Sequence, residues 1–357
     1  RGLNSLAHRT TWLRSDLAGP ARCAAPARAS YAYAVAPGSE AAIRWLAGVL
    51  ADSVRVWHAP NGFRVGTADF PRGAFVVRVG ANDSSVHAKV ARRAAESGAA
   101  VASLATGLVD AGTDLGSGSV VPVRAPRVAL LGGAPVTGTS YGFAWFALDH
   151  RVGYAATALD AAAVAGGALG DFDVLVVPSV QGPALDRALG DAGRVRVAAS
   201  VRGVGTLVTL NAGTAWLAGQ AWSRFKRASA PAGDGAALAG DIPGAAVRAV
   251  ADSLSPLMAG VDARELPVLL FSDRVFDAPR DLRPGEVVLR HAPAARLRVA
   301  GYLWPEMPAR VAGSPYLWTE RLGQGRIVAF AGDPNFRDLW RGLLPLFANA
   351  LFLGSTF

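Results

Sequence analysis

The sequence contains a single cysteine, Cys23, and only five histidines in 357 residues. One cysteine excludes an intrachain disulfide, a cysteine-based zinc cluster and a C-x-x-C redox pair. None of the histidines begins an H-x-x-E pair or belongs to an H-E-x-x-H motif, the patterns in which paired side chains hold zinc. We therefore expect this chain to hold no metal and no cofactor by itself.

Long hydrophobic runs are also missing. The nearest, residues 343–353, is broken by Pro345 and Asn349. It is shorter than the roughly 18 apolar residues that a membrane-spanning helix needs. We therefore expect no transmembrane segment.

Lysine is nearly absent, although the net charge is +9. Only Lys89 and Lys226 are lysines, and the other 34 of the 36 basic residues are arginines spread along the chain. A surface that follows nucleic-acid phosphates usually combines clustered basic residues with aromatic ones. The dispersed arginines therefore predict no nucleic-acid partner.

The residues that are present indicate a folded protein, with 51% hydrophobic and 18% charged residues. The length predicts about two domains. We interpret residues 1–30 as a linker or N-terminal segment, residues 31–122 as a small α/β domain and residues 123–357 as a larger one. Because the first residue is Arg1 and not methionine, we expect the chain to follow a cleavage or to belong to a longer product.

The small domain is predicted from short strands that alternate with helical patterns. Residues 31–36 form an apolar strand, after which Ser39 is placed to cap a helix with apolar residues at the 3.6-residue period. Residues 74–79 form another strand. A second amphipathic helix then ends at Gly98.

The larger domain contains continuous apolar runs separated by helix-length segments. Runs that are apolar on both faces are typical of parallel strands covered by helices, so we predict a doubly wound, flavodoxin-like sheet. Residues 219–264 interrupt this rhythm and are interpreted as an insertion. The predicted strands are residues 128–131, 174–177, 206–210, 268–271 and 327–330, and the predicted helices include residues 141–150, 184–200 and 336–353.

The loop after the first of these strands offers a candidate nucleophile. Residues 138–142, Gly-Thr-Ser-Tyr-Gly, formally match the G-x-S-x-G elbow of serine hydrolases. Asp173 and His291 would complete the order Ser, Asp, His. Residues 134–137 separate the serine from its strand, however, and the alternative is that Thr139 or Ser140 caps the following helix.

Two further strand-end loops carry polar residues. Asn211 follows residues 206–210, at the place where class I glutamine amidotransferases carry the cysteine of a G-x-C-x-G elbow. An asparagine cannot form a thiolate, so we expect no amidotransferase activity. In the last loop we interpret Asp333 and Asn335 as helix caps and Arg337 as one partner of an ion pair. The candidate binding residues at the strand ends are Ser140, Tyr141, Trp145, Asn211, Asp333, Asn335 and Arg337.

The order and spacing of several motifs carry a resemblance that covers the chain from about residue 31 to its end. The chain resembles the region that follows the catalytic domain in large bacterial zinc carboxypeptidases of the carboxypeptidase A type. The motifs are Phe-Pro-Arg-Gly-Ala-Phe-Val-Val at 70–77, Asn82, Pro-Arg-Val-Ala-Leu-Leu at 126–131, Thr-Ser-Tyr-Gly at 139–142 with Trp145, Asp-Val-Leu-Val-Val-Pro at 173–178, Gly-Gln-Gly-Arg at 323–326 and Asp-Pro-Asn-Phe-Arg at 333–337.

The resemblance implies a small α/β region followed by a class I glutamine amidotransferase-like domain, exported from a bacterium to the periplasm or the exterior. The zinc ligands and catalytic glutamate of that family lie in the peptidase domain, and no position here matches them. We therefore expect a non-catalytic accessory region whose partner is a peptidase domain in the same or a processed chain, with peptide or cell-envelope material as a further partner.

Two alternatives stay open. One is a serine hydrolase that uses Ser140. The other is a self-assembling structural subunit, favoured by the apolar C-terminal residues 343–357.

Overall fold

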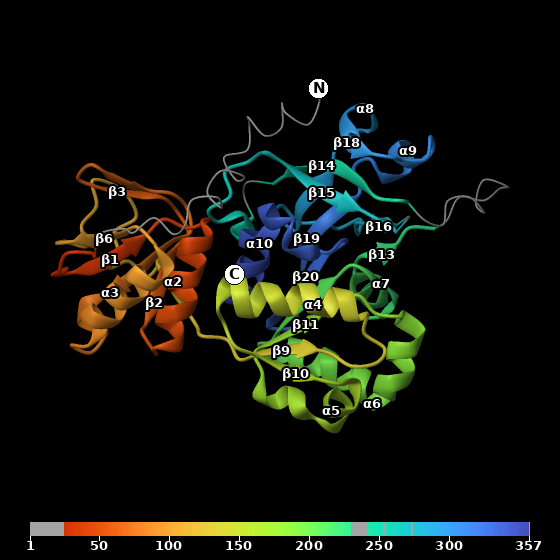
Figure 1. The fold of residues 1–357 in the computed structure, drawn as a ribbon, viewed down its shortest axis with the longest axis horizontal. Helices are drawn as coiled ribbons and strands as arrows, with labels where there is room; N and C mark the ends of the chain where they lie inside the picture. Colours follow the sequence, from red (N-terminus) through yellow and green to blue (C-terminus); the bar gives the residue numbers. More distant parts are fainter. Residues whose placement is uncertain (1–24, 230–241, 253–254, 273, 357) are drawn as a thin grey trace.

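The computed structural model describes residues 25–229, 242–252, 255–272 and 274–356. Most of the predicted linker, including Cys23, lies outside these ranges, as does part of the predicted insertion. The N-terminal unit is built on a five-stranded antiparallel sheet with the order β6-β1-β5-β2-β8 (Figure 1). Its strands are β1 (Ala32–Val35), β2 (Val56–Ala59), β5 (Ala74–Arg78), β6 (Val101–Leu104) and β8 (Val121–Val123), the last of which crosses the predicted boundary at 122.

Two helices cover one face of this sheet. Helix α2 (Glu40–Ala51) begins after Ser39, whose Oγ accepts the backbone N–H of Ala42 at 3.0 Å, as the sequence predicted. Helix α3 (Val86–Ser97) ends at Gly98, which has a φ of +74°. The other face of the sheet packs against a three-stranded sheet made of β3 (Phe63–Val65), β4 (Ala68–Phe70) and β7 (Ala111–Gly112).

The second unit contains a ten-stranded mixed sheet, of which five strands are parallel. Numbered along the chain from one to five, these strands lie side by side in the order 2-1-3-4-5 across the sheet. This is the flavodoxin-like arrangement. The predicted fold class is therefore confirmed. These strands, in chain order, are β9 (Val128–Leu131), β10 (Ala156–Leu159), β11 (Val174–Val177), β12 (Thr206–Leu210) and β20 (Gly325–Phe330).

Helices cover both faces of this parallel part, which explains why its central strands β9, β11 and β12 are buried throughout. Along β9, Val128 and Leu130 enter one core while Ala129 and Leu131 enter the other. The first core contains residues of α4 (Gly138–Phe146) and α10 (Leu344–Phe352), and the second contains residues of α5 (Ala161–Gly166), α6 (Gly182–Gly203) and α7 (Ala212–Gly219).

The remaining strands of the large sheet are antiparallel, and here one prediction was wrong. The apolar run at 268–271 lies in β15 (Glu265–Leu270), which pairs antiparallel with β14 (Ala245–Ala251) at one end of the sheet. The parallel strand that was not predicted is β10, an edge strand with no buried residue. In β15 only alternate residues are buried, so its apolar run indicates neither burial of both faces nor a parallel neighbour.

The segment between β12 and β20 therefore adds a second half to the sheet. Strands β13 and β14 fall within the predicted insertion, and the other additions follow them in the chain. They are β17 (Val287–His291), β18 (Arg298–Gly301) and β19 (Pro315–Leu322), with β13 (Lys226–Arg227) and β16 (Phe276–Asp277) forming a separate two-stranded sheet.

The C-terminal helix is shorter than the predicted 336–353. Helix α10 starts at Leu344, after two separate 3-10 turns. Arg337 and Asp338 have φ values of +52° and +55°. Left-handed residues cannot continue a right-handed helix, so the helix begins only after them.

The two units share part of their core and several polar contacts. Arg151 forms ion pairs with Glu40 of α2 and with Asp338. A Cβ on Gly38 would lie only 2.0 Å from the carbonyl oxygen of Gly260, so the two backbones are in direct contact. Among the described residues, no helix combines the length and the apolar character needed to cross a bilayer.

Two buried histidines make stability depend on pH. Burial lowers the pKa of both His58 and His291 to about 4, whereas an unfolded chain binds these protons near pH 6.5. The unfolded state thus holds more protons between these values, and the free energy of unfolding falls as the pH is lowered. From pH 7.5 to pH 5 we expect a loss of about 2 kcal/mol per histidine in urea denaturation.

The variant His58→Leu should remove about half of that combined loss. His150→Gln is the matched control, because the His150 side chain is 53% exposed. Equal pH dependence in the wild type and His58→Leu would contradict the assignment.

Candidate functional site

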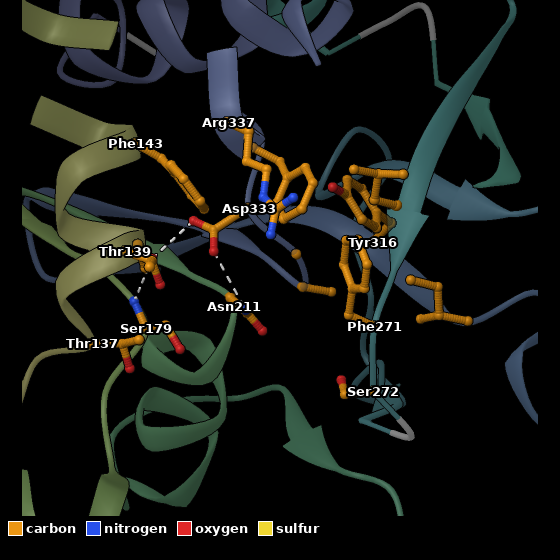
Figure 2. Close-up of a pocket in the computed structure, with 16 residues that line it drawn as sticks. Thr137, Thr139, Phe143, Ser179, Asn211, Phe271, Ser272, Tyr316, Asp333 and Arg337 are labelled. Carbon is orange, nitrogen blue, oxygen red and sulfur yellow. Dashed lines mark hydrogen bonds between the residues drawn. The ribbon is translucent and has the colours of Figure 1, made fainter. Parts of the chain in front are cut away.

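A pocket of about 280 Å³ lies beyond the carboxyl ends of the parallel strands (Figure 2). Ser140 follows β9, Ser179 follows β11, Asn211 follows β12 and Asp333 follows β20, and all four line the pocket. Carboxyl ends of parallel strands meet at one edge of a sheet, which brings these residues together from distant parts of the chain. We call this the edge pocket.

Asp333 is at the centre of the hydrogen bonds between the side chains of the edge pocket. Ser140 Oγ donates to Asp333 Oδ1 at 2.9 Å and accepts the backbone N–H of Ser179 at 2.9 Å. Asn211 Nδ2 donates to Asp333 Oδ2 at 3.2 Å, and Arg274 Nη2 donates to Asn211 Oδ1 at 2.6 Å. These bonds hold the three pocket side chains in one fixed arrangement (Figure 2).

The backbone at Asn211 is strained, with φ +51° and ψ −117°. Non-glycine residues rarely adopt such angles, and strain of this kind is concentrated at functional sites. At Gly213 the turn packs directly against the backbone that follows β11. A Cβ there would lie 2.4 Å from the carbonyl oxygen of Pro178 and 2.7 Å from that of Val177, so only glycine fits. The chain thus has the sharp strand-to-helix turn of a nucleophile elbow, with an amide at its tip.

The charges in the edge pocket are sparse. Burial raises the pKa of the Asp333 carboxyl, while hydrogen bonds from Ser140 and Asn211 and the charge of Arg274 act in the opposite direction. Arg337 is exposed and lies over the Phe336 ring at 5.1 Å. Tyr316 is 1% exposed, and its hydroxyl has no hydrogen-bond partner among the described residues.

Several interpretations of these residues were wrong. Thr137 precedes α4, and its N-cap position has no side-chain hydrogen bond, so neither Thr139 nor Ser140 caps that helix. Asp333 accepts hydrogen bonds from Ser140 and Asn211 and does not cap a helix. Asn335 precedes a 3-10 turn, but its side chain makes no capping hydrogen bond to it. Among the described residues, Arg337 forms no ion pair.

Three of the seven candidate residues lie outside the edge pocket. The Tyr141 ring packs beside Gly132, where a Cβ would lie 2.9 Å from it. Trp145 is 42% exposed and its ring contacts His150. Asn335 is buried next to the pocket-lining residues without lining the pocket itself.

The proposed serine hydrolase triad is not assembled. Asp173 pairs with Arg127 at 3.2 Å, at the start of β11 and therefore at the opposite edge of the sheet. His291 bonds the Ser314 hydroxyl through Nδ1 at 3.0 Å. No histidine, cysteine or lysine lines the edge pocket in the described part of the chain.

Sequence reasoning missed four contributors: Ser179, Phe271, Arg274 and Tyr316. Ser179 could have been found, because it also follows a parallel strand. Phe271 follows β15, which was predicted as a parallel strand, and Tyr316 lies in β19, which was not predicted; both belong to the antiparallel half of the sheet. In the described ranges, no cluster of three or more His, Cys, Asp or Glu side chains could hold a metal ion.

No family model and no curated protein matches the sequence. Among solved structures, the chain is similar to a ThuA-like protein of Bacteroides uniformis ATCC 8492, with a TM-score of 0.41 and 13% identity over 62% of this chain and 89% of that one. The chain is also similar to a cytoplasmic protein of Salmonella typhimurium LT2, with a TM-score of 0.41 and 12% identity over 63% of this chain and 98% of that one.

A β-galactosidase of Bacillus circulans sp. alkalophilus gives a TM-score of 0.38 and 14% identity over 64% of this chain, which spans 30% of that enzyme. Similarities at this level do not assign an activity to this chain. The function must therefore be argued from the edge pocket itself.

Proposed function

We propose that this chain is a non-catalytic accessory region of a secreted zinc carboxypeptidase-like protein, and that it binds a small molecule in the edge pocket. The observation that supports a binding role is the strained turn with Asn211 at the nucleophile position. Its amide is engaged by Arg274 and Asp333, and an amide is no nucleophile. The fold keeps the geometry of an elbow while the residue at its tip holds neighbouring groups in place.

Ser140 does not replace the missing nucleophile. Its hydroxyl donates to Asp333, a carboxylate that could accept the proton, but none of the histidines that the structure describes lines the pocket and its Oγ already accepts a backbone N–H. We expect ester and amide hydrolysis by the wild type and by Ser140→Ala to be equal and at the buffer rate. An ester-hydrolysis rate above buffer that disappears only in Ser140→Ala would refute the non-catalytic role.

The accessory role is tested by the protein in its native source. Intact mass and peptide mapping should find residues preceding Arg1 that include an H-x-x-E pair, together with carboxypeptidase activity that a chelator removes. A native product with a mass near that of this chain alone and with no associated chelator-sensitive carboxypeptidase would contradict it.

The structural-subunit alternative loses the observation that favoured it. Every residue of α10 is buried, so the apolar C-terminal segment fills the core of this chain and is no free surface for assembly.

A further inference from the structure

The edge pocket contains two opposite charges that do not neutralise each other. Asp333 and Arg337 both line it, and in the described part of the chain Arg337 has neither an ion pair nor a hydrogen bond. Asp333 accepts one bond at each carboxylate oxygen, so each oxygen can accept another. A ligand with one charge of each sign would pair with both residues (Figure 2).

A third polar group in the pocket is unsatisfied. The Tyr316 hydroxyl is buried and has no hydrogen-bond partner within the described ranges, and a Cβ on Gly332 would lie 3.0 Å from its oxygen. Gly332 precedes Asp333, so this hydroxyl lies next to the charged end of the pocket. Burial and the nearby Asp333 raise the pKa of Tyr316, which therefore stays a neutral donor. A buried donor without an acceptor costs about 1–3 kcal/mol, which a ligand oxygen would offset.

Three phenylalanine rings form part of the remaining wall. The Phe336 ring lies 4.8 Å from Phe271 and 5.4 Å from Phe143, and all three rings line the pocket. Phe271 is 41% exposed, so part of its ring is accessible. A volume of about 280 Å³ is at the small end of ligand sites and suits a single small molecule.

We infer that the edge pocket binds a free α-amino acid with an apolar side chain. Arg337 and the Tyr316 hydroxyl receive its carboxylate, Asp333 receives its ammonium group, and the phenylalanine rings contact its side chain. This inference rests on the proposed non-catalytic binding role. A neutral polyol would use the hydroxyl and amide groups but would leave both charges unpaired and the aromatic wall without an apolar partner.

Calorimetric titration of this chain with four probes tests the ligand class. L-Phenylalanine should bind, while 2-phenylethylamine, which lacks the carboxylate, and 3-phenylpropionate, which lacks the ammonium, should each bind at least tenfold more weakly. Sorbitol should not bind. Equal affinity for either single-charge analogue, binding of sorbitol, or no heat with L-phenylalanine would each overturn the inference.

Three variants test the residue assignments. Arg337→Gln should weaken L-phenylalanine binding at least tenfold, and Arg187→Gln, an exposed arginine on α6, should not change it. Tyr316→Phe should weaken binding while leaving the melting temperature of the free protein unchanged or higher, because it removes an unsatisfied buried hydroxyl. Unchanged affinity in both Arg337→Gln and Tyr316→Phe would overturn the assignment.

Failure of this inference can be separated from failure of the proposed function. Recovery of chemically altered L-phenylalanine after incubation would refute the non-catalytic role. Unaltered phenylalanine with no binding heat would leave that role intact and refute only the ligand class.

Discussion

Gly213→Ala is expected to destabilise the protein by about 3 kcal/mol or more, since the added methyl group would meet two fixed backbone atoms. The Cβ would lie 2.4 Å from the carbonyl oxygen of Pro178 and 2.7 Å from that of Val177. Neither oxygen belongs to a flexible side chain that could turn away. The change therefore separates α7 from the end of β11 and distorts the turn that presents Asn211.

Gly219→Ala is the matched control, because Gly219 lies in the same helix with nothing within 4 Å of the added Cβ. Alanine favours a helix over glycine by up to about 1 kcal/mol, so this variant should be neutral or slightly stabilised. Urea denaturation, monitored by tryptophan fluorescence, measures the free energy of unfolding of both variants. A loss of similar size in the two variants would show that contact at Gly213 is not the cause.

Glu320→Ala is expected to have an effect of similar size for a different reason. Glu320 lies in β19, is 1% exposed, and accepts hydrogen bonds from the Ser223 hydroxyl at 2.9 Å, the Arg224 backbone N–H at 2.6 Å and the Trp318 indole at 3.2 Å. Burial raises the pKa of this carboxyl, while those hydrogen bonds oppose the shift. Alanine would leave the Arg224 backbone N–H and the Trp318 indole N–H without an acceptor, whereas the Ser223 hydroxyl can donate to the Phe225 carbonyl oxygen at 3.1 Å. Two unsatisfied donors cost about 2–6 kcal/mol.

The control for this second prediction is Glu306→Ala, at an exposed glutamate that makes no side-chain cap hydrogen bond. It should change the free energy of unfolding by less than about 0.5 kcal/mol. Glu320→Gln should lose an amount of stability between those of Glu306→Ala and Glu320→Ala, because the amide keeps one acceptor oxygen but directs an N–H group at the remaining donors. A Glu320→Ala protein as stable as Glu306→Ala would mean that water replaces the carboxylate at no cost.

The amphipathic and apolar patterns were sufficient for much of the fold. The helix after Ser39 and the strands β9, β11, β12 and β20 could be predicted, because burial of one or both faces is written directly into residue order. Strand β10 could not, since an edge strand with exposed residues lacks that signal. The direction of β15 could not either, because pairing depends on which neighbour the chain meets in space.

The candidate site divides in the same way. Ser140, Asn211, Asp333 and Arg337 were found because each lies near the end of a predicted strand, where ligands of such sheets bind. The capping roles given to Ser140 and Asp333 were wrong, since capping is a local explanation and these two residues, 193 positions apart in the chain, bond each other. Sequence spacing is therefore a poor guide to the partners of polar side chains in this site.

The sequence by itself determined an α/β architecture, the flavodoxin-like class, and the lack of a cysteine at the elbow, because these follow from periodicity and residue identity. Only the tertiary structure decided that Asp333 joins Ser140 to Asn211, and that Tyr316 and Phe271 complete the pocket from the antiparallel half. The physical reason is that hydrogen bonds and pocket walls depend on distance in space, and strand pairing brings together residues that no local pattern connects.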